Sequence, residues 1–200
     1  VGNPTERFKE DALRMLRAIR FSAQLDFDIE AQTFAAIKQQ AASISYIAME
    51  RINMELSKVW TSKHAARAID YIEQSNLANF LEGSFSKLNW QHFQTKNPQV
   101  GWAYFCFVNN CDTSLLTVYR CSNKDKQFTK QVFAAYNALQ TGLQVMDYLH
   151  FDDEVLQTTL FTTAIPQDVY YSWDNDQKTG DKNTIYTITL NDVYGNVEVN

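Results

Sequence analysis

The 200-residue sequence has only three cysteines, three histidines and no apolar run near the ~18 residues that a membrane span requires. Cys106, Cys111 and Cys121 form no CxxC pair and have no histidine nearby, which argues against a disulfide framework and a zinc site. No charged-then-apolar leader opens the chain. We therefore expect reduced, mostly buried thiols in a soluble, cytoplasmic protein without a membrane partner, and the sequence predicts no particular oligomeric state.

The histidines and the acidic residues also supply no catalytic or metal site. His64, His92 and His150 are widely spaced and lack the neighbours of a catalytic triad, so we expect them at the surface or in packing contacts. The densest acidic cluster, HFDDE at residues 150–154, fits a solvated helix start better than a metal site. We predict no catalytic residue and no metal ligand within this sequence.

Charge is distributed unevenly along the chain. The formal net charge is −5, but residues 1–60 sum to 0, residues 61–150 to +2 and residues 151–200 to −7. Because the excess acid lies in the last quarter, the first three quarters can face a polyanion without net repulsion. The charge pattern therefore permits nucleic-acid binding without predicting it.

The first three quarters of the chain have helical periodicity, which predicts a mainly α-helical fold. Asn3, Pro4 and Glu6 fit an N-cap, a first-turn proline and a capping-box glutamate, so we expect one helix from Pro4 to Leu25. Ser122 is a second candidate cap. Further helices are expected over residues 29–42, 47–60, 63–77 and 123–140.

Beyond Ile165 the pattern changes to alternation with period two. VYYSW, TIYTITL and VYGNVEV are β-branched and aromatic runs, separated by DNDQKTGDKN and by the dipeptide ND, which are turn-forming sequences. We expect a small antiparallel β meander at the C-terminus of a helical bundle.

Residues 10–21, EDALRMLRAIRF, combine an apolar helix face with a charged stripe. At about 100° per residue, we expect one arc of this helix to face the core. The residues of that arc are Ala12, Leu13, Met15, Leu16, Ile19 and Ala23. We expect Asp11, Arg14, Arg17 and Arg20 to follow one another around the opposite side. Asp11 and Arg14 are then surface neighbours, which places a carboxylate that only accepts beside a guanidinium that only donates.

Such a pair can read the edge of a nucleotide base. Cytosine and adenine both present an amine that donates beside a ring nitrogen that accepts, and a carboxylate and a guanidinium satisfy both. Uracil and guanine reverse this order, and a well-made bidentate contact discriminates by roughly 1 to 3 kcal/mol. Asp-x-x-Arg on a rigid helix can thus select C and A without a template strand. The alternative is a solvated helix face with modest ion pairs, and spacing alone leaves both open.

Two segments resemble the bacterial class II tRNA nucleotidyltransferases, the CCA-adding enzymes and their poly(A) polymerase relatives. GNPTERFKEDALRMLRAIRFSAQLDFDIE (residues 2–30) fits the pattern around the family's EDxxR motif, and ISYIAMERINMELSKVW (residues 44–60) is similar to its IS…ERI…EL.K helix. The fitting positions of the first segment are Gly2, Pro4, Arg7, Phe8, Glu10, Asp11, Arg14, Arg17, Arg20 and Phe21.

The resemblance implies an amino-acid template that reads incoming CTP and ATP. In it Asp11 accepts from the base amine and Arg14 donates to the ring nitrogen. It also implies a nucleotide-binding position for Arg17 and Arg20, which steady this face or meet phosphate, and a supporting position for Glu10 and Arg7. The expected parts are an RNA- and nucleotide-binding neck at residues 1–60, a helical body at 61–165, and a β-like segment at 166–200 that departs from the family's helical tail.

The family's catalytic head lies before EDxxR. Its glycine-rich loop, its metal-binding DxD carboxylates and its RRD motif have no counterpart in this sequence, so we expect them upstream of Val1. By resemblance the parent enzyme extends the 3′ end of tRNA with CTP and ATP, using Mg²⁺ held by the head, and the fragment alone is not expected to catalyse. The alternatives are an enzyme that adds only CC or only A, a poly(A) polymerase, or a free-standing RNA-binding or interaction module without catalysis.

Overall fold

The computed structural model describes residues 2–86, 88, 95–141, 151, 155, 159, 188–192 and 195–199. The chain divides into two compact units, residues 1–130 and residues 131–200. The described part is mainly α-helical, which confirms the predicted fold class. Among its helices, none is long and apolar enough to cross a membrane. The expected divisions after residues 60 and 165 stay predictions.

The N-terminal segment forms two helices where the sequence predicted one. α1 spans Pro4–Glu10 and α2 spans Leu13–Leu25. Asn3 caps α1 as expected, because its Oδ1 accepts from the Thr5 amide at 2.9 Å. The prediction of one continuous helix is wrong because Asp11 has an extended backbone, with φ −153° and ψ 103°, that ends α1.

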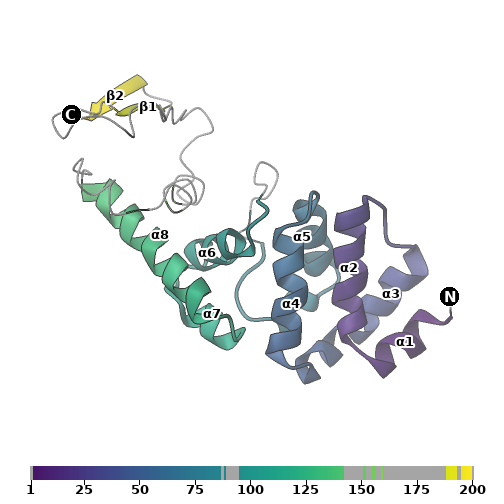
Figure 1. Ribbon diagram of the computed structural model, residues 1–200. Coiled ribbons are helices and arrows are strands. Elements are labelled where there is room, and N and C mark those ends of the chain that lie inside the picture. The colour runs from purple at the N-terminus through teal and green to yellow at the C-terminus, as the bar shows by residue number, and fades with distance from the viewer. Residues whose placement is uncertain are drawn as a thin grey trace. The chain divides into compact units, whose positions relative to one another are not determined.

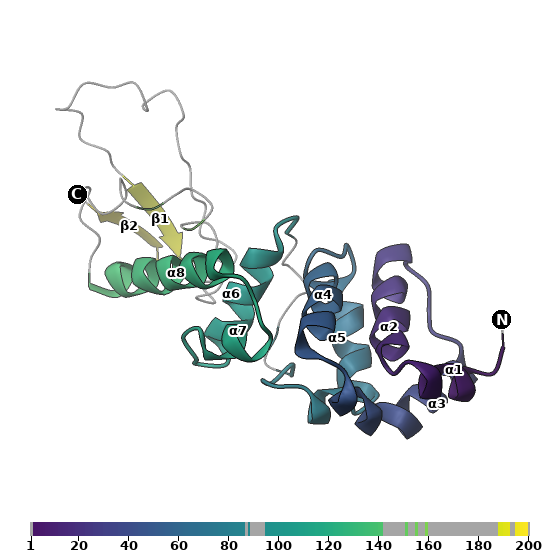
Figure 2. The same cartoon turned by 60° about the horizontal axis from the view of Figure 1, so that its bottom comes forward.

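The first unit continues with a bundle of helices around α2. Its elements are α3 (Ala31–Gln40), the 3₁₀ helix η1 (Ala41–Tyr46), α4 (Met49–Trp60), α5 (Ala65–Gln74) and the 3₁₀ helix η2 (Leu77–Phe80). α2 packs against α4 and α5 (Figure 1), and α1 packs against α3 (Figure 2). The apolar arc of α2 is buried as predicted, and each fully buried Leu, Ile or Met side chain stabilises the fold by about 1.5–3 kcal/mol.

The very apolar segment after Asn97 is helix α6 (Pro98–Val108), which is followed by α7 (Ser114–Val118). It lacks a polar face because its residues from Gln99 to Cys106 are all buried. An aromatic cluster joins it to α4, with neighbouring ring centroids 5.0 to 6.3 Å apart. The cluster consists of Trp60, Phe85, Trp102, Phe105 and Tyr119. These contacts fix the C-terminal end of α4 in the core.

Helix α8 (Asn123–Thr141) begins with the predicted cap. Ser122 Oγ accepts from the Asp125 amide at 3.2 Å, and the Asp125 carboxylate accepts from the Ser122 amide at 2.8 Å. The thiols also match their prediction, because Cys106 and Cys121 are buried and all three cysteines are free. Burial raises the pKa of the Cys121 thiol to about 12.

In the second unit, the described part includes one antiparallel pair of strands. β1 spans Ile188–Asp192 and β2 spans Gly195–Val199, in the C-terminal segment where strands were expected. Ile188 lies opposite Val199 in this ladder. The predicted turn at Asn191 and Asp192 is wrong, because both residues belong to β1.

Other predictions fall on residues that are not described. VYYSW, His92, His150 and residues 152–154 of HFDDE lie outside the described part of the chain. His64 is described, and its partly exposed side chain places Nε2 3.6 Å from Asp26 Oδ1.

Candidate nucleotide-reading site

Asp11 occupies the break between α1 and α2. Its Oδ1 accepts a hydrogen bond from the Leu13 amide at 3.1 Å, and its carbonyl oxygen accepts one from the Arg14 amide at 3.1 Å. A short acid is favoured here because its side chain satisfies an amide that the first turn of a helix leaves free. Asp11 and Arg14 are therefore fixed relative to each other at the start of α2.

Arg51, in the first turn of α4, holds the other carboxylate oxygen of Asp11. Its Nη2 donates to Asp11 Oδ2 at 2.9 Å. The Asp11 side chain is 25% exposed, so this ion pair is partly shielded from solvent. With different donors on its two oxygens, the plane of the carboxylate is defined.

Arg14 is held by Glu10, the last residue of α1. Arg14 Nη1 donates to Glu10 Oε2 at 2.8 Å, and Arg7 Nη1 donates to the same oxygen at 3.2 Å. Among the described residues the Arg14 side chain has no further partner, so its Nε and Nη2 remain available as donors. Glu10 thus holds one end of the Arg14 guanidinium without using all of its donors, and the supporting role expected for Glu10 and Arg7 stays a prediction.

The surrounding cations keep Asp11 ionised. Partial burial acts to raise the pKa of Asp11, but the hydrogen bonds from Arg51 and the Leu13 amide, with the charges of Arg51 and Arg14, outweigh it and lower the pKa. The hydrogen bond from Arg7 likewise lowers the pKa of Glu10. Asp11 is therefore purely an acceptor at neutral pH, as recognition of a base amine requires.

The other two arginines of the stripe have different environments. Arg17 is exposed and makes no ion pair with any residue that the structure describes. Arg20 is only 8% exposed, and its Nε lies 2.8 Å from Oε2 of Glu55 on α4. The prediction that Arg20 shares the solvent-facing side is wrong. On a helical wheel it falls between Leu13 and Leu16, inside the apolar arc, where Glu55 neutralises it.

The sequence analysis did not single out Arg51 and Glu55, although both lie in the segment similar to the family's ERI helix. The acid Asp11 lies just before α2 and the base Arg20 lies within it, whereas in α4 the base Arg51 precedes the acid Glu55. This opposite order of charges was the sequence feature that could have indicated the two ion pairs. It could be used only with the knowledge that α2 and α4 lie side by side.

The residues of the site do not fit a metal ion. The described part of the chain contains no group of three or more histidines, cysteines or carboxylates that could bind one. Asp11 and Glu10 are each paired with arginine, and this positive surrounding disfavours a cation. The arrangement suits instead a neutral polar edge that donates to Asp11 and accepts from Arg14.

Comparison with known proteins finds relatives for the helices that follow the break at Asp11, including α4, which carries Arg51. Residues 26–84, which include α3, α4 and α5, match the family model described as "Probable RNA and SrmB- binding site of polymerase A". The CCA-adding enzyme of Geobacillus sp. (strain WCH70) is 32% identical over 150 residues, covering 70% of this chain and 36% of that protein. The CCA-adding enzyme of Bacillus cytotoxicus is 34% identical over 152 residues, covering 70% and 37%. The chain thus spans less than half the length of these curated relatives.

Solved structures show the same fold. The crystal structure of Bacillus stearothermophilus CCA-adding enzyme in complex with CTP matches with a TM-score of 0.70 and 24% identity, covering 82% of this chain and 44% of that chain. A complex structure of CCA-adding enzyme with CTP matches with a TM-score of 0.56 and 18% identity, covering 82% and 46%. At these identities the likeness establishes the fold alone.

The fold and the matched helices place the chain in the class of helical proteins that share the polymerase A family model. The EDxxR segment and the sequence relatives narrow this class further. The chain belongs to the family of bacterial CCA-adding enzymes, the class II tRNA nucleotidyltransferases.

Proposed function

We propose that this chain is the neck and body part of a CCA-adding enzyme and selects the CTP and ATP that are added to the 3′ end of tRNA. The observation that carries the proposal is the pair formed by Asp11 and Arg14. Asp11 is held as an ionised acceptor, and Arg14 keeps donors available beside it. The CCA-adding enzymes among the sequence relatives, and the CCA-adding enzyme solved in complex with CTP, support this assignment.

The pair distinguishes bases by matching donors to acceptors. Asp11 accepts from the exocyclic amine of cytosine or adenine, and Arg14 donates from Nε or Nη2 to the ring nitrogen next to it. Uracil and guanine would place a carbonyl against Asp11 and an N–H against Arg14, which leaves both unpaired. The discrimination expected from one bidentate contact is roughly 1–3 kcal/mol, or about 5- to 150-fold.

Arg17 completes the proposed nucleotide contacts. It lies one turn after Arg14 on α2, is exposed, and has no ion-pair partner among the described residues. A guanidinium in this position suits a phosphate oxygen of the bound nucleotide. Arg20, in contrast, forms a buried ion pair with Glu55, so we assign it a structural role at the interface between α2 and α4.

Catalysis itself belongs to another part of the proposed parent enzyme. Nucleotidyl transfer would draw on Mg²⁺ as a Lewis acid, and the acids described here form no group that could hold this ion. We assign Mg²⁺ to a head domain outside this sequence. The residues of this chain bind, orient and discriminate the nucleotide, and the match to an RNA-binding family model supports tRNA as the partner.

Extension of tRNA by the full natural reading frame tests the proposal. The substrate is a tRNA that lacks its 3′ CCA, offered with labelled CTP and ATP. Addition of CC followed by A is the expected result. Arrest after CC would indicate an enzyme that adds only CC. Extension only of tRNA that already ends in CC would indicate an enzyme that adds only A, and long A tracts would indicate a poly(A) polymerase. RNA binding without extension, by a protein whose reading frame encodes no head, would overturn the proposal in favour of a binding module.

A further inference from the structure

We propose that Arg51 is a specificity-determining positioning residue, which sets the orientation of the Asp11 carboxylate and thereby the discrimination between bases. This inference rests on the proposed function, because Arg51 acts through Asp11. It adds a residue on a different helix, outside the Asp-x-x-Arg pair.

The need for such a residue follows from where Asp11 lies. Its backbone is extended and lies outside both α1 and α2, and the terminal torsion of an aspartate is broad. The Leu13 amide binds only Oδ1, at 3.1 Å, which leaves the carboxylate free to pivot about that contact. Arg51 Nη2, at 2.9 Å from Oδ2, provides the second anchor. Two anchors on different oxygens define the direction of the remaining lone pairs.

Arg51 does not block the base. A carboxylate offers about four acceptor sites, and Leu13 and Arg51 use two of them. Each oxygen therefore keeps a lone pair for an amine. Arg51 also lowers the pKa of Asp11, which is in keeping with a direct contact to the charged carboxylate.

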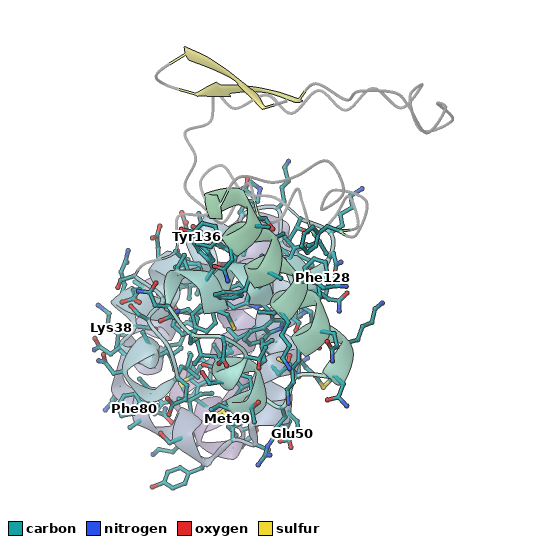
Figure 3. The ribbon with its side chains drawn as sticks, turned by 90° about the vertical axis from the view of Figure 1, so that its left-hand side faces the viewer. Lys38, Met49, Glu50, Phe80, Phe128 and Tyr136 are labelled. Carbon is teal, nitrogen blue, oxygen red and sulfur yellow. The ribbon has the colours of Figure 1, made fainter. Side chains whose placement is uncertain are left out.

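The helix that carries Arg51 is rigidly placed. Ile52 and Leu56 are fully buried on α4, and Trp60 at its C-terminal end lies in the aromatic cluster. The buried pair of Glu55 with Arg20 ties the same helix to α2. Glu50, the preceding residue, is exposed at the surface (Figure 3), and the Arg51 side chain is itself 49% exposed, so Arg51 lies at the edge of a fixed helix. A group held by a rigid element keeps the productive geometry better than one held by a loop.

Loss of Arg51 should change selectivity more than rate. Asp11 would stay ionised at neutral pH but could turn to present a different lone pair. A misplacement of about 1 Å in a catalytic or binding group can cost up to 100-fold. We expect the preference for CTP over UTP, measured as the ratio of kcat/KM, to fall about tenfold in Arg51→Ala.

The test uses the full natural reading frame and five variants, one of which is Asp11→Ala alone. Arg51→Ala removes the anchor, and Arg51→Lys keeps the charge without the fork, so it should restore part of the selectivity. The double variant of Asp11→Ala with Arg51→Ala shows whether Arg51 acts through Asp11. Arg120→Ala is the matched control, because Arg120 is 66% exposed and only 3.9 Å from Glu50, one residue from Arg51. The measurements are kcat/KM for the four nucleotides and the melting temperature.

The expected result is a tenfold loss of selectivity in Arg51→Ala, none in Arg120→Ala, and no further loss when Arg51→Ala is added to Asp11→Ala. If Arg51→Ala and Arg51→Lys both keep wild-type selectivity while Asp11→Ala loses it, the inference is wrong and the proposed function stands. An equal loss for all four nucleotides with a lowered melting temperature would show a structural role alone and also overturn the inference. If Asp11→Ala itself keeps full selectivity, the proposed function fails.

Discussion

The Asp11 carboxylate and the Arg51 guanidinium, 40 positions apart in the chain, meet at 2.9 Å. This contact joins the break between α1 and α2 to the first turn of α4. Asp11 thereby has two roles that depend on each other. Its Oδ1 satisfies the amide of Leu13, the first residue of α2, and it presents a charged acceptor of fixed orientation beside Arg14.

The pKa of Asp11 should lie below its ordinary value of 3.8, because Arg51 stabilises the charged form. With the folded pKa lowered, this contact contributes stability at pH values above 3.8 and loses it as the pH falls through the folded pKa. Arg51→Ala should raise the Asp11 pKa and remove this part of the acid dependence. Titration of the Asp11 side-chain carboxyl carbon by NMR measures this pKa in the wild type and in Arg51→Ala. The difference between the two pKa values gives the change in the acid dependence of stability. An Asp11 pKa that does not respond to Arg51→Ala would contradict the ion pair.

Arg20→Ala should destabilise the protein strongly, because it leaves the buried Glu55 carboxylate without its main partner. Breaking a buried pair costs about 3–5 kcal/mol, and we expect the lower end because Lys58 Nζ lies 3.7 Å from the other Glu55 oxygen. Urea unfolding gives the free energy difference.

The control for this prediction removes both charges together. Arg20→Met combined with Glu55→Leu should retain most of the stability, since neither charge is left unpaired. A loss of less than about 1 kcal/mol in Arg20→Ala alone would show that the pair is weakly buried in solution.

Gly101→Ala should lower the melting temperature, although alanine is about 1 kcal/mol better than glycine in a helix interior. A Cβ at position 101 of α6 would collide with Trp60 Cβ, and it would lie 2.6 Å from Trp60 Cγ. Trp60 is fully buried in the aromatic cluster and has no room to move. We expect a loss of about 1–3 kcal/mol, measured by thermal unfolding. A raised melting temperature would mean that α6 does not approach α4 this closely.

Arg17→Ala should weaken the binding of all four nucleotides equally. Its proposed partner is a phosphate, which every nucleotide carries, so KM should rise by about two- to fivefold, as for an exposed charge contact. The preference for CTP over UTP should not change. Lys38→Ala is the control, because Lys38 is an exposed cation on α3 (Figure 3) whose Nζ lies 5.0 Å from the Phe34 ring. A change of selectivity in Arg17→Ala would place Arg17 at the base instead.

Local patterns predicted most of the helical fold. Asn3 and Ser122 cap helices where the sequence indicated, and the apolar arc of α2 is buried. The break at Asp11 was missed because the periodicity of α2 continues backwards into α1. An acid directly before an apolar run was nevertheless the signal of a new cap.

The site could be predicted only in part. Asp11 and Arg14 come from one short segment, so spacing and family resemblance were enough to name them. Arg51 and Glu55 act across a tertiary contact between α2 and α4, which no local pattern contains. Arg20 was wrongly predicted at the surface because charged side chains usually face solvent. In the structure it is buried and forms an ion pair with Glu55 on the neighbouring helix α4.

The base-reading role of Asp11 and Arg14 is tested most directly by the nucleotide selectivity of the full natural reading frame. Extension of tRNA lacking its 3′ CCA is followed with labelled CTP, ATP, UTP and GTP for the wild type, Asp11→Ala and Arg14→Ala. We predict that the wild type adds only C and A, and that both substitutions erode discrimination against UTP and GTP by about 5- to 150-fold. Selectivity that survives both substitutions would contradict the role and leave Asp11 and Arg14 as a solvated helix start.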